Sequence, residues 1–288
     1  MIDFFVIGSP RSGTTLLRLL LNSNPAILVP PECGFVIWLK KYQYNFLHNS
    51  KDQFFDSFVQ DLLGCRKFST WKLNEKDIKQ GILDSDCNSY QSICRAIHRV
   101  YANKHGRTFL YCGDKNNFYT SHVDELRDLF VGSKFIHIIR DGRDIACSYR
   151  EVMHIPATSP YHPKLPTEIS AIAHEWRKNI ISVRNAFHKI SENNKIEIRY
   201  EDIIQDAPTV LDKVCKFIGV PYHSAMLNFH LLNRRSEIEP TLTMDWKQKT
   251  LVPVESSSML RYVRELSQDE SNVFIDISGD ILNEYKYI

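Results

Sequence analysis

The sequence lacks several features that mark particular classes of protein. No apolar run approaches the roughly 18–20 residues that a membrane-spanning helix needs, and the N-terminus has neither a basic segment nor a small-residue cleavage site. With 36 basic and 34 acidic side chains, the net charge of +2 gives no general attraction to nucleic acid or to a membrane surface. We therefore expect a cytoplasmic protein with no membrane span and no nucleic-acid partner, in which any anion site is built locally.

The cysteines also lack the spacing of a disulfide framework or of a zinc site. There are seven of them, an odd number; no two are spaced C-x-x-C, and no Cys/His cluster has zinc-finger spacing. We expect reduced thiols and no metal. A chain of 288 residues with 43% hydrophobic side chains buries a core that needs no cross-links, and this composition excludes a disordered, collagen-like or coiled-coil chain.

Short apolar segments that alternate with helical patterns indicate a parallel sheet. Residues 4–7 and 134–139 are almost wholly apolar, as in strands that are buried on both faces. We predict further strands at 108–112 and 196–200. The predicted helices lie at 14–22, 89–105, 121–130, 143–153, 168–191 and 208–217. Strands that alternate with helices predict an α/β fold of the P-loop type, with three layers and a central parallel sheet flanked by helices.

No linker or internal repeat divides the chain, so we predict a single domain over residues 1–288. It carries a helical insert at about 35–105 and a helical tail at about 256–288. A loop with four prolines is expected at 155–167, where it would act as a mobile lid, and the stretch 233–255 looks irregular and basic. The insert and the proline loop are both candidates for shaping a substrate pocket, and the sequence does not decide between them.

The first chemical feature is a glycine-rich loop, GSPRSGTT from Gly8 to Thr15, between a predicted strand and a predicted helix. It shares the spacing of its glycines, and Thr15, with the Walker pattern G-x-x-x-x-G-K-[ST]. Thr14, however, stands where that pattern has its lysine, and the cation of the loop is Arg11. The backbone N–H groups of such a loop and of the following helix form a cradle for phosphate. The missing lysine argues against an ordinary NTPase.

Cationic side chains at the ends of predicted strands point to an anionic ligand. Arg140 directly follows the strand at 134–139, Ser148 lies eight residues later on the next helix, and Lys115 comes just after another strand. Ligands of an open α/β sheet bind at the carboxyl ends of its strands, and a guanidinium recognises phosphate in a bidentate manner. One ligand with two separated anionic groups would engage Arg11, Lys115 and Arg140.

Arg140 and Glu32 can each be interpreted either as a structural ion-pair partner or as a residue that acts on a ligand. Arg140 could pair with Asp141 or Asp144 in a surface network instead of binding a ligand. Glu32 lies in a segment fixed by prolines, and a carboxylate near a cationic pocket is a candidate general base. It could also be a salt-bridge partner of Arg11, and the two roles are compatible.

Taken together, these residues resemble the family of sulfotransferases that use 3′-phosphoadenosine-5′-phosphosulfate (PAPS). The loop at 10–16 is similar to the family's 5′-phosphosulfate loop, and residues 134–148 are similar to its 3′-phosphate segment. Residues 199–202 and 217–219 are similar to a later strand and helix of the family. The closest pattern is that of the tyrosylprotein sulfotransferases and their bacterial relatives. The resemblance runs from about residue 4 to 220, with a gap across 35–105.

The resemblance implies a role for each of these residues. The residues that would hold the 5′-phosphosulfate are Arg11, Ser12, Gly13, Thr14 and Thr15. It further implies that Arg140 and Ser148 hold the 3′-phosphate and that Tyr200 lies near the nucleotide. Glu32 would take the proton of an acceptor hydroxyl. Lys115, together with Arg11, would neutralise the leaving phosphate, with 3′-phosphoadenosine-5′-phosphate (PAP) as the product and no metal.

The sequence also departs from the family in places. Cytosolic sulfotransferases have a basic histidine two residues after the corresponding lysine; here that position is Asn117, which favours Glu32 as the base. The tail beyond 233 matches poorly, so that Arg234, Arg235 and Lys247 are alternatives for a further contact with the 3′-phosphate.

Two other functions and the identity of the acceptor stay open at this point. The alternatives are a P-loop nucleotide kinase or NTPase with an aberrant loop, and a non-catalytic module that binds a phosphonucleotide. The acceptor hydroxyl could belong to a small molecule, a carbohydrate, a lipid or a protein tyrosine. The oligomeric state, including a homo-oligomer, is equally open.

Overall fold

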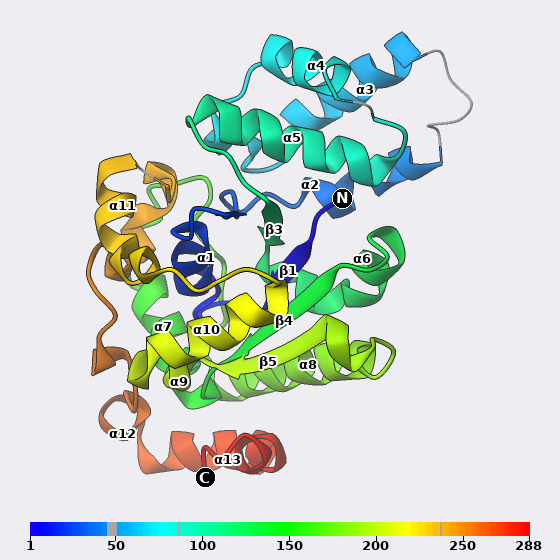
Figure 1. Ribbon diagram of the computed structural model, residues 1–288. Coiled ribbons are helices and arrows are strands. Elements are labelled where there is room, and N and C mark those ends of the chain that lie inside the picture. Colours follow the sequence, from blue (N-terminus) through cyan, green and yellow to red (C-terminus); the bar gives the residue numbers. More distant parts are fainter. Residues whose placement is uncertain (45–50, 86, 237) are drawn as a thin grey trace.

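A computed structural model describes residues 1–44, 51–85, 87–236 and 238–288 (Figure 1). A sheet of five strands lies at its centre, in the order β2-β3-β1-β4-β5, and all neighbouring strands are parallel. The strands are β1 (Phe4–Ile7), β2 (Ile27–Leu28), β3 (Tyr111–Lys115), β4 (Lys134–Ile139) and β5 (Lys195–Arg199). The parallel sheet confirms the predicted α/β fold class.

The helices form three groups along the chain. Those that flank the sheet are α1 (Thr14–Asn22), α6 (Val123–Leu129), α7 (Gly142–Met153), α8 (Ile169–Phe187), α9 (Tyr200–Gln205) and α10 (Ala207–Ile218). Those of the insert are α2 (Phe35–Trp38), α3 (Lys51–Leu63), α4 (Glu75–Leu83) and α5 (Tyr90–Lys104). Those that follow are α11 (Phe229–Ser236), α12 (Tyr262–Glu265) and α13 (Gln268–Glu284). Short 3₁₀ turns are η1 (Lys40–Gln43), η3 (Phe68–Trp71), η4 (Asn117–Ser121), η5 (Glu192–Asn194), η6 (Ser224–Asn228), η7 (Thr241–Trp246), η8 (Gln248–Leu251) and η9 (Ser256–Ser258).

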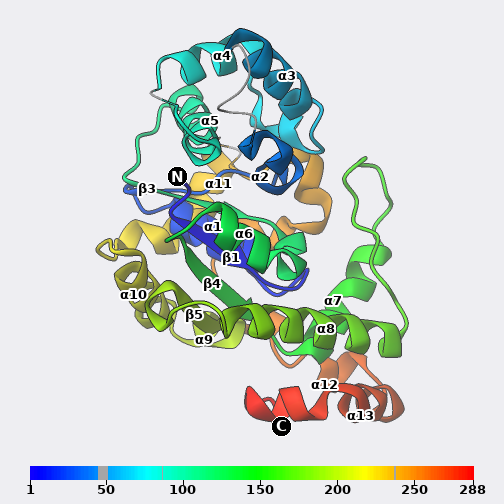
Figure 2. The same ribbon diagram turned by 90° about the vertical axis from the view of Figure 1, so that its right-hand side faces the viewer.

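The central strand β1 divides the core into two layers. Successive side chains of a strand point to opposite faces, so Phe4 and Val6 pack with α1 and α10, whereas Phe5 and Ile7 pack on the face that α6 covers. Burial on both faces explains why this strand is uniformly apolar. The tail helix α13 packs against the outer side of α8, and both views place it on the side of the molecule away from the insert (Figures 1 and 2).

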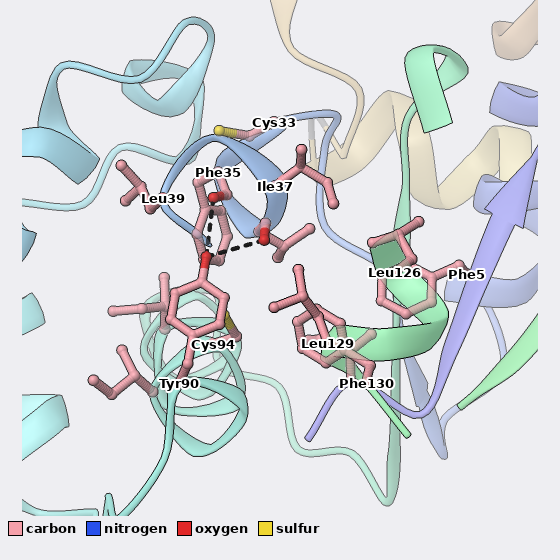
Figure 3. Close-up of a cluster of buried hydrophobic side chains, with 14 of the residues drawn as sticks. Phe5, Cys33, Phe35, Ile37, Leu39, Tyr90, Cys94, Leu126, Leu129 and Phe130 are labelled. Carbon is pink, nitrogen blue, oxygen red and sulfur yellow. Dashed lines mark hydrogen bonds between the residues drawn. The ribbon is translucent and has the colours of Figure 1, made fainter. Parts of the chain in front are cut away.

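The insert shares its core with the sheet. Tyr90 of α5 donates hydrogen bonds to the carbonyls of Phe35 and Val36 in α2, at 3.2 and 3.0 Å. Figure 3 shows these residues in one apolar cluster with Phe5 of β1 and Phe130, which follows α6. Residues 45–50 and 86 of the predicted insert lie outside the described residues. This common core supports the prediction of a single domain, which stays a prediction.

Several element boundaries differ from those expected from the sequence. The strand predicted at 108–112 is in fact β3, three residues later, so that Lys115 is its last residue and does not follow it. Gly113 permits this, because a Cβ there would lie 2.2 Å from the ring of Phe4 on the neighbouring strand. The helix predicted at 121–130 is present as α6 but is shorter, at Val123–Leu129, and the 3₁₀ turn η4 at Asn117–Ser121 precedes it.

Three further differences concern a helix end, a short strand and a stretch that was expected to be irregular. The helix predicted at 168–191 ends at Phe187, as α8. The short edge strand β2 was not predicted, because two residues carry no recognisable period. The stretch 233–255, expected to be irregular, contains the end of α11 and two 3₁₀ turns, η7 and η8.

Candidate active site

The loop between β1 and α1 has the backbone of an anion cradle. Arg11 and Gly13 both adopt positive φ angles, of 65° and 100°. A Cβ at Gly13 would lie 2.4 Å from Cδ2 of Tyr200, so that only glycine fits there. The hydroxyls of Ser9 and Ser12 are buried and have no hydrogen-bond partner among the described residues. Buried polar atoms are rarely left unpaired, so this loop is shaped for an anionic ligand.

The same loop leads directly into helix α1. Gly13 is its N-cap, and no side chain in the described part of the protein caps the first turn. The N–H groups of this turn are therefore available to a phosphate and carry the positive end of the helix dipole. Thr14 donates a hydrogen bond to Oδ1 of Asn117 at 2.8 Å. Asn117, which follows β3, thus helps to orient the phosphate loop.

A single cleft collects the sequence-predicted residues at the carboxyl ends of the strands. Its empty volume is about 1330 Å³ when its open mouth is included. The predicted site residues that line it are Arg11, Gly13, Thr14, Thr15, Glu32, Lys115, Arg140, Ser148 and Tyr200. Ser12 is buried beneath the loop.

At one end of the cleft, Arg140 is held by three elements. It donates one hydrogen bond to the Arg11 carbonyl at 3.0 Å and another to the Ser258 carbonyl, and its guanidinium lies 4.6 Å from the centre of the Tyr200 ring. Its Nε has no partner among the described residues and remains available to a ligand. Asp144 lies 3.9 Å away, so the alternative ion pair exists, but it is buried and does not belong to a surface network.

At the other end of the cleft, Lys115 and Glu32 form an ion pair beside the phosphate loop. Lys115 is 1% exposed, and its Nζ donates to Oε2 of Glu32 and to Oγ1 of Thr15, at 3.3 Å each. Lys67 lies 3.5 Å from the other Glu32 oxygen. Burial alone would raise the pKa of Glu32, but Lys115 and Lys67 outweigh it and lower that pKa to about 2. Burial lowers the pKa of Lys115, and Glu32 opposes this.

Arg11 faces the end of the cleft that contains Arg140. Its Nε donates to Oγ of Ser148 and its Nη1 to the Trp246 carbonyl, both at 3.0 Å. Burial, and then the neighbouring Arg140, lower its pKa to about 10, so it stays charged at neutral pH. Within the described ranges, Glu32 pairs with the two lysines and makes no ion pair with Arg11, so the salt bridge considered from the sequence is absent.

A turn of the insert holds the segment that carries Glu32. The indole N–H of Trp71 donates to the Pro31 carbonyl at 2.9 Å, and the Cys33 thiol donates to the Arg66 carbonyl at 3.6 Å. Lys67 lies in the same turn with a positive φ of 69°. Sequence reasoning missed Lys67, because nothing distinguishes a lysine in an insert without a motif until the fold brings it to a carboxylate.

The proline loop and the C-terminal segment close the remaining walls. Tyr161, in the loop at 155–167, is hydrogen-bonded to Ser69 of the insert at 3.0 Å. Thr158 of the loop donates to Asp245 at 2.8 Å. Figure 2 shows this loop rising from the layer of α7 and α8 toward the insert. Insert and loop therefore meet at the cleft, which Lys67 of the insert and Tyr161 of the loop both line.

The three basic residues that the sequence offered for a further 3′-phosphate contact differ in their position relative to the cleft. Lys247 lines the cleft and is 8% exposed. Arg234 and Arg235 lie on α11 with exposed side chains and do not line the cleft. Lys249, a residue that the sequence did not single out, also lines the cleft.

Two other observations concern the chain as a whole. Six of the cysteines are free thiols in the described part of the protein: Cys33, Cys65, Cys94, Cys112, Cys147 and Cys215. Across the described residues, no helix has both the length and the apolar composition that crossing a bilayer requires.

Comparisons with known proteins show which family the chain is similar to. A sequence model of the sulfotransferase family matches residues 3–224. A putative protein-tyrosine sulfotransferase of Caenorhabditis briggsae is 25% identical over 228 residues, which are 79% of this chain and 69% of that protein. The protein-tyrosine sulfotransferase of Drosophila melanogaster is 20% identical over 275 residues, 95% of this chain and 49% of its own length. The chain thus spans about half to two thirds of the curated relatives it matches.

The fold is similar to a solved structure as well. The sulfotransferase domain of the Synechococcus PCC 7002 olefin synthase superposes with a TM-score of 0.54, at 19% sequence identity, over 96% of this chain and 94% of that one. This likeness supports the fold, and the family match covers most of the chain, including the phosphate loop and the ends of all five strands. The protein therefore belongs to the sulfotransferase family.

Proposed function

We propose that this protein transfers a sulfuryl group from PAPS to an acceptor hydroxyl. The observation that carries the proposal is the buried Lys115–Glu32 pair, which touches Thr15 of the phosphate loop inside the cleft. A carboxylate for the acceptor proton and a cation for the leaving phosphate are thereby next to the loop that would hold that phosphate. Family membership supports the same chemistry.

The donor would lie along the cleft with its two anionic groups at opposite ends. Its 3′-phosphate would bind the unpaired Nε of Arg140 and the hydroxyl of Ser148. Its 5′-phosphosulfate would lie on the N–H groups of the loop and of the first turn of α1, where the unpaired hydroxyls of Ser9 and Ser12 are also found. The ring of Tyr200, which already packs on Arg140, would lie near the nucleotide.

The chemical step needs one proton acceptor and cations at the leaving group. The acceptor oxygen forms a bond to sulfur while the bond from sulfur to the 5′-phosphate oxygen breaks, in line, as in phosphoryl transfer. Glu32 takes the proton of the acceptor hydroxyl, and its lowered pKa keeps it ionised at neutral pH. Lys115 donates a hydrogen bond to the leaving oxygen, and Arg11 adds positive charge from the loop. The products are the sulfate ester, PAP and a protonated Glu32, which returns its proton to water.

The acceptor class follows less directly from the chain. Relatives named as protein-tyrosine sulfotransferases favour a tyrosine hydroxyl as one acceptor to test, and hydroxyls of carbohydrates and small molecules belong in the same screen. The kinase alternative is not favoured, because Thr14 occupies the place of the Walker lysine.

The test combines binding with turnover. Thermal unfolding is measured with PAP, with AMP, and with ATP plus Mg²⁺; a ligand at 100 times its dissociation constant stabilises the fold by about 2.7 kcal/mol. Transfer of radiolabelled sulfate from PAPS is then measured to a tyrosine peptide, a chitooligosaccharide and a small alcohol. We expect stabilisation by PAP above that by AMP, and transfer to at least one acceptor. Stabilisation by ATP with Mg²⁺ alone would support a kinase, and PAP binding without transfer to any acceptor would support a non-catalytic module.

A further inference from the structure

The end of the cleft at Lys115 contains more positive charge than its own carboxylates balance. Lys115 and Lys67 face Glu32. Beyond them lies a second buried group, in which Lys247 pairs with Glu239. Arg18 of α1 pairs with the same carboxylate at 2.5 Å.

Four cations and two carboxylates therefore share this region, and two positive charges are left in excess. Uncompensated charge is costly when buried. A phosphosulfate group carries one negative charge on phosphate and one on sulfate, and so would match this excess.

Lys247 is held in place by contacts from its own segment. Its ammonium donates to Oε1 of Glu239 and to Oγ1 of Thr243, the latter at 3.3 Å. Glu239 in turn accepts a bond from Thr243 at 2.8 Å, and its backbone N–H donates to Asn233 at 2.8 Å. An ammonium has three donors; two are used in these contacts, and among the described residues the third has no partner, so it is available to a ligand in the cleft that Lys247 lines.

The neighbouring charges show which end of the cleft each C-terminal lysine serves. The charges that act most strongly on Lys247 are those of Glu239, Lys115, Glu32 and Lys67. Those that act on Lys249, whose side chain is 54% exposed, come from the other end of the cleft: Glu151, Arg261, Arg140 and Arg11. Lys247 therefore belongs to the end where sulfuryl transfer is proposed, and Lys249 to the end with the 3′-phosphate residues.

We propose that Lys247 is a further catalytic residue, whose ammonium binds the phosphosulfate beside Lys115 and offsets the charge that develops on the leaving 5′-phosphate oxygen. Glu239, anchored by Arg18, is the positioning residue that orients it. This inference rests on the proposed sulfuryl transfer and deepens it. It adds a third cation at the leaving group to Lys115 and to Arg11, whose guanidinium also donates a hydrogen bond to Ser148. Lys247 stays protonated throughout the step, so it neither gives nor takes a proton.

The proposal predicts a specific pH dependence. Burial lowers the pKa of Lys247 to about 8, against the opposing effect of Glu239. Lys115 and Lys67 lower it as well, and Glu32 raises it. The charge of Lys247 is present below this pKa and lost as the pH rises through it, so kcat should fall on the alkaline side. A bound anionic donor moves this limb to a pH above 8.

The experiment compares three variants with the wild type, using PAPS and the best acceptor of the panel. Lys247→Met should lower kcat by about 10²–10³-fold, while PAP still stabilises the variant against unfolding. Lys247→Arg keeps the charge at all accessible pH values and should retain measurable turnover with its alkaline limb shifted upward. Glu239→Gln should shift that limb to lower pH. Lys216→Met is the matched control, because Lys216 is 75% exposed in a surface pair with Asp212.

Each outcome supports or overturns the proposal. A kcat of Lys247→Met within about threefold of the wild-type value would overturn it. An alkaline limb of the kcat profile that moves in neither Lys247→Arg nor Glu239→Gln would also overturn it, and this second result holds even if the methionine variant fails to fold. A wild type that binds PAP but transfers sulfate to no acceptor counts against the proposed function, and the role of Lys247 falls with it. Wild-type turnover with an unaffected methionine variant counts against Lys247 alone.

Discussion

Replacing Glu32 by glutamine separates its chemical role from its electrostatic one. Glu32 is buried between Lys115 and Lys67 with 15% of its side chain exposed. Lowering its pKa from 4.5 to about 2 corresponds to roughly 3 kcal/mol of net stabilisation of the ionised carboxylate. Glutamine keeps the shape of the side chain and removes this charge. We therefore expect Glu32→Gln to abolish turnover and to lower the melting temperature by about 5 °C in a chain of this length.

The same charges determine how the stability difference between wild type and variant depends on pH and how the variant binds PAP. A carboxylate whose pKa is lowered in the folded state contributes its stability above its unfolded pKa of about 4.5 and loses it as the pH falls toward 2. The difference between wild type and variant should thus be constant from pH 8 to about 5 and shrink below that. Removing a negative charge also leaves the lysines freer to pair with an anion, so PAP should bind the variant at least as tightly as the wild type.

The assay is thermal unfolding with and without PAP, alongside sulfate transfer from PAPS. Glu192→Gln is the control, because Glu192 is 88% exposed in a surface pair with Lys195, and such pairs contribute little. A Glu32→Gln variant that keeps wild-type turnover would remove Glu32 as the base. A melting temperature within a degree of the wild type would show that the buried charge cluster does not stabilise the free protein.

Three other perturbations test separate parts of the site. Gly13→Ala should destabilise the fold by several kcal/mol and abolish PAP binding, because the new Cβ would meet Tyr200 and φ is 100°; a variant that unfolds and binds like the wild type would contradict the close approach. Arg140→Lys loses the planar fork and should weaken PAP by about tenfold while leaving AMP unchanged, which titration calorimetry can check; equal losses for both nucleotides would place Arg140 away from the 3′-phosphate. Tyr161→Phe removes the hydrogen bond to Ser69 and should raise the KM of the acceptor by a few-fold with PAP affinity unchanged; an effect on PAP alone would exclude the proline loop from the acceptor side.

Local patterns in the sequence were enough to predict that part of the candidate site lies together. The loop from Gly8 to Thr15 and Arg140 stand directly after buried strands, and the rule that ligands bind at the strand ends brought them to one cleft. The bounds of β3 were predicted three residues too early because the sequence of Gly113–Lys115 is typical of a loop. Only the pairing with Phe4 on the neighbouring strand makes it part of the sheet.

Contacts between distant segments were beyond the reach of local patterns. Lys67 reaches Glu32 from the insert, and Arg18 of α1 reaches Glu239 in the C-terminal segment; neither pair has a spacing that identifies it. The direction of the Arg11 side chain is likewise set by Ser148, 137 positions along the chain. Such contacts depend on the tertiary fold, so the pairings were found only in the structure.

The turn that holds the segment of Glu32 has a consequence for how the family can diversify. The segment of Glu32, the proposed base, is tied to the insert through Trp71 and Pro31, whereas Lys115 belongs to the sheet. In the proposed mechanism, the distance between proton acceptor and leaving group is therefore a distance between two substructures. A chimera that exchanges the insert to change the acceptor must carry residues 30–33 together with the turn at 64–72, or it will separate the base from the donor.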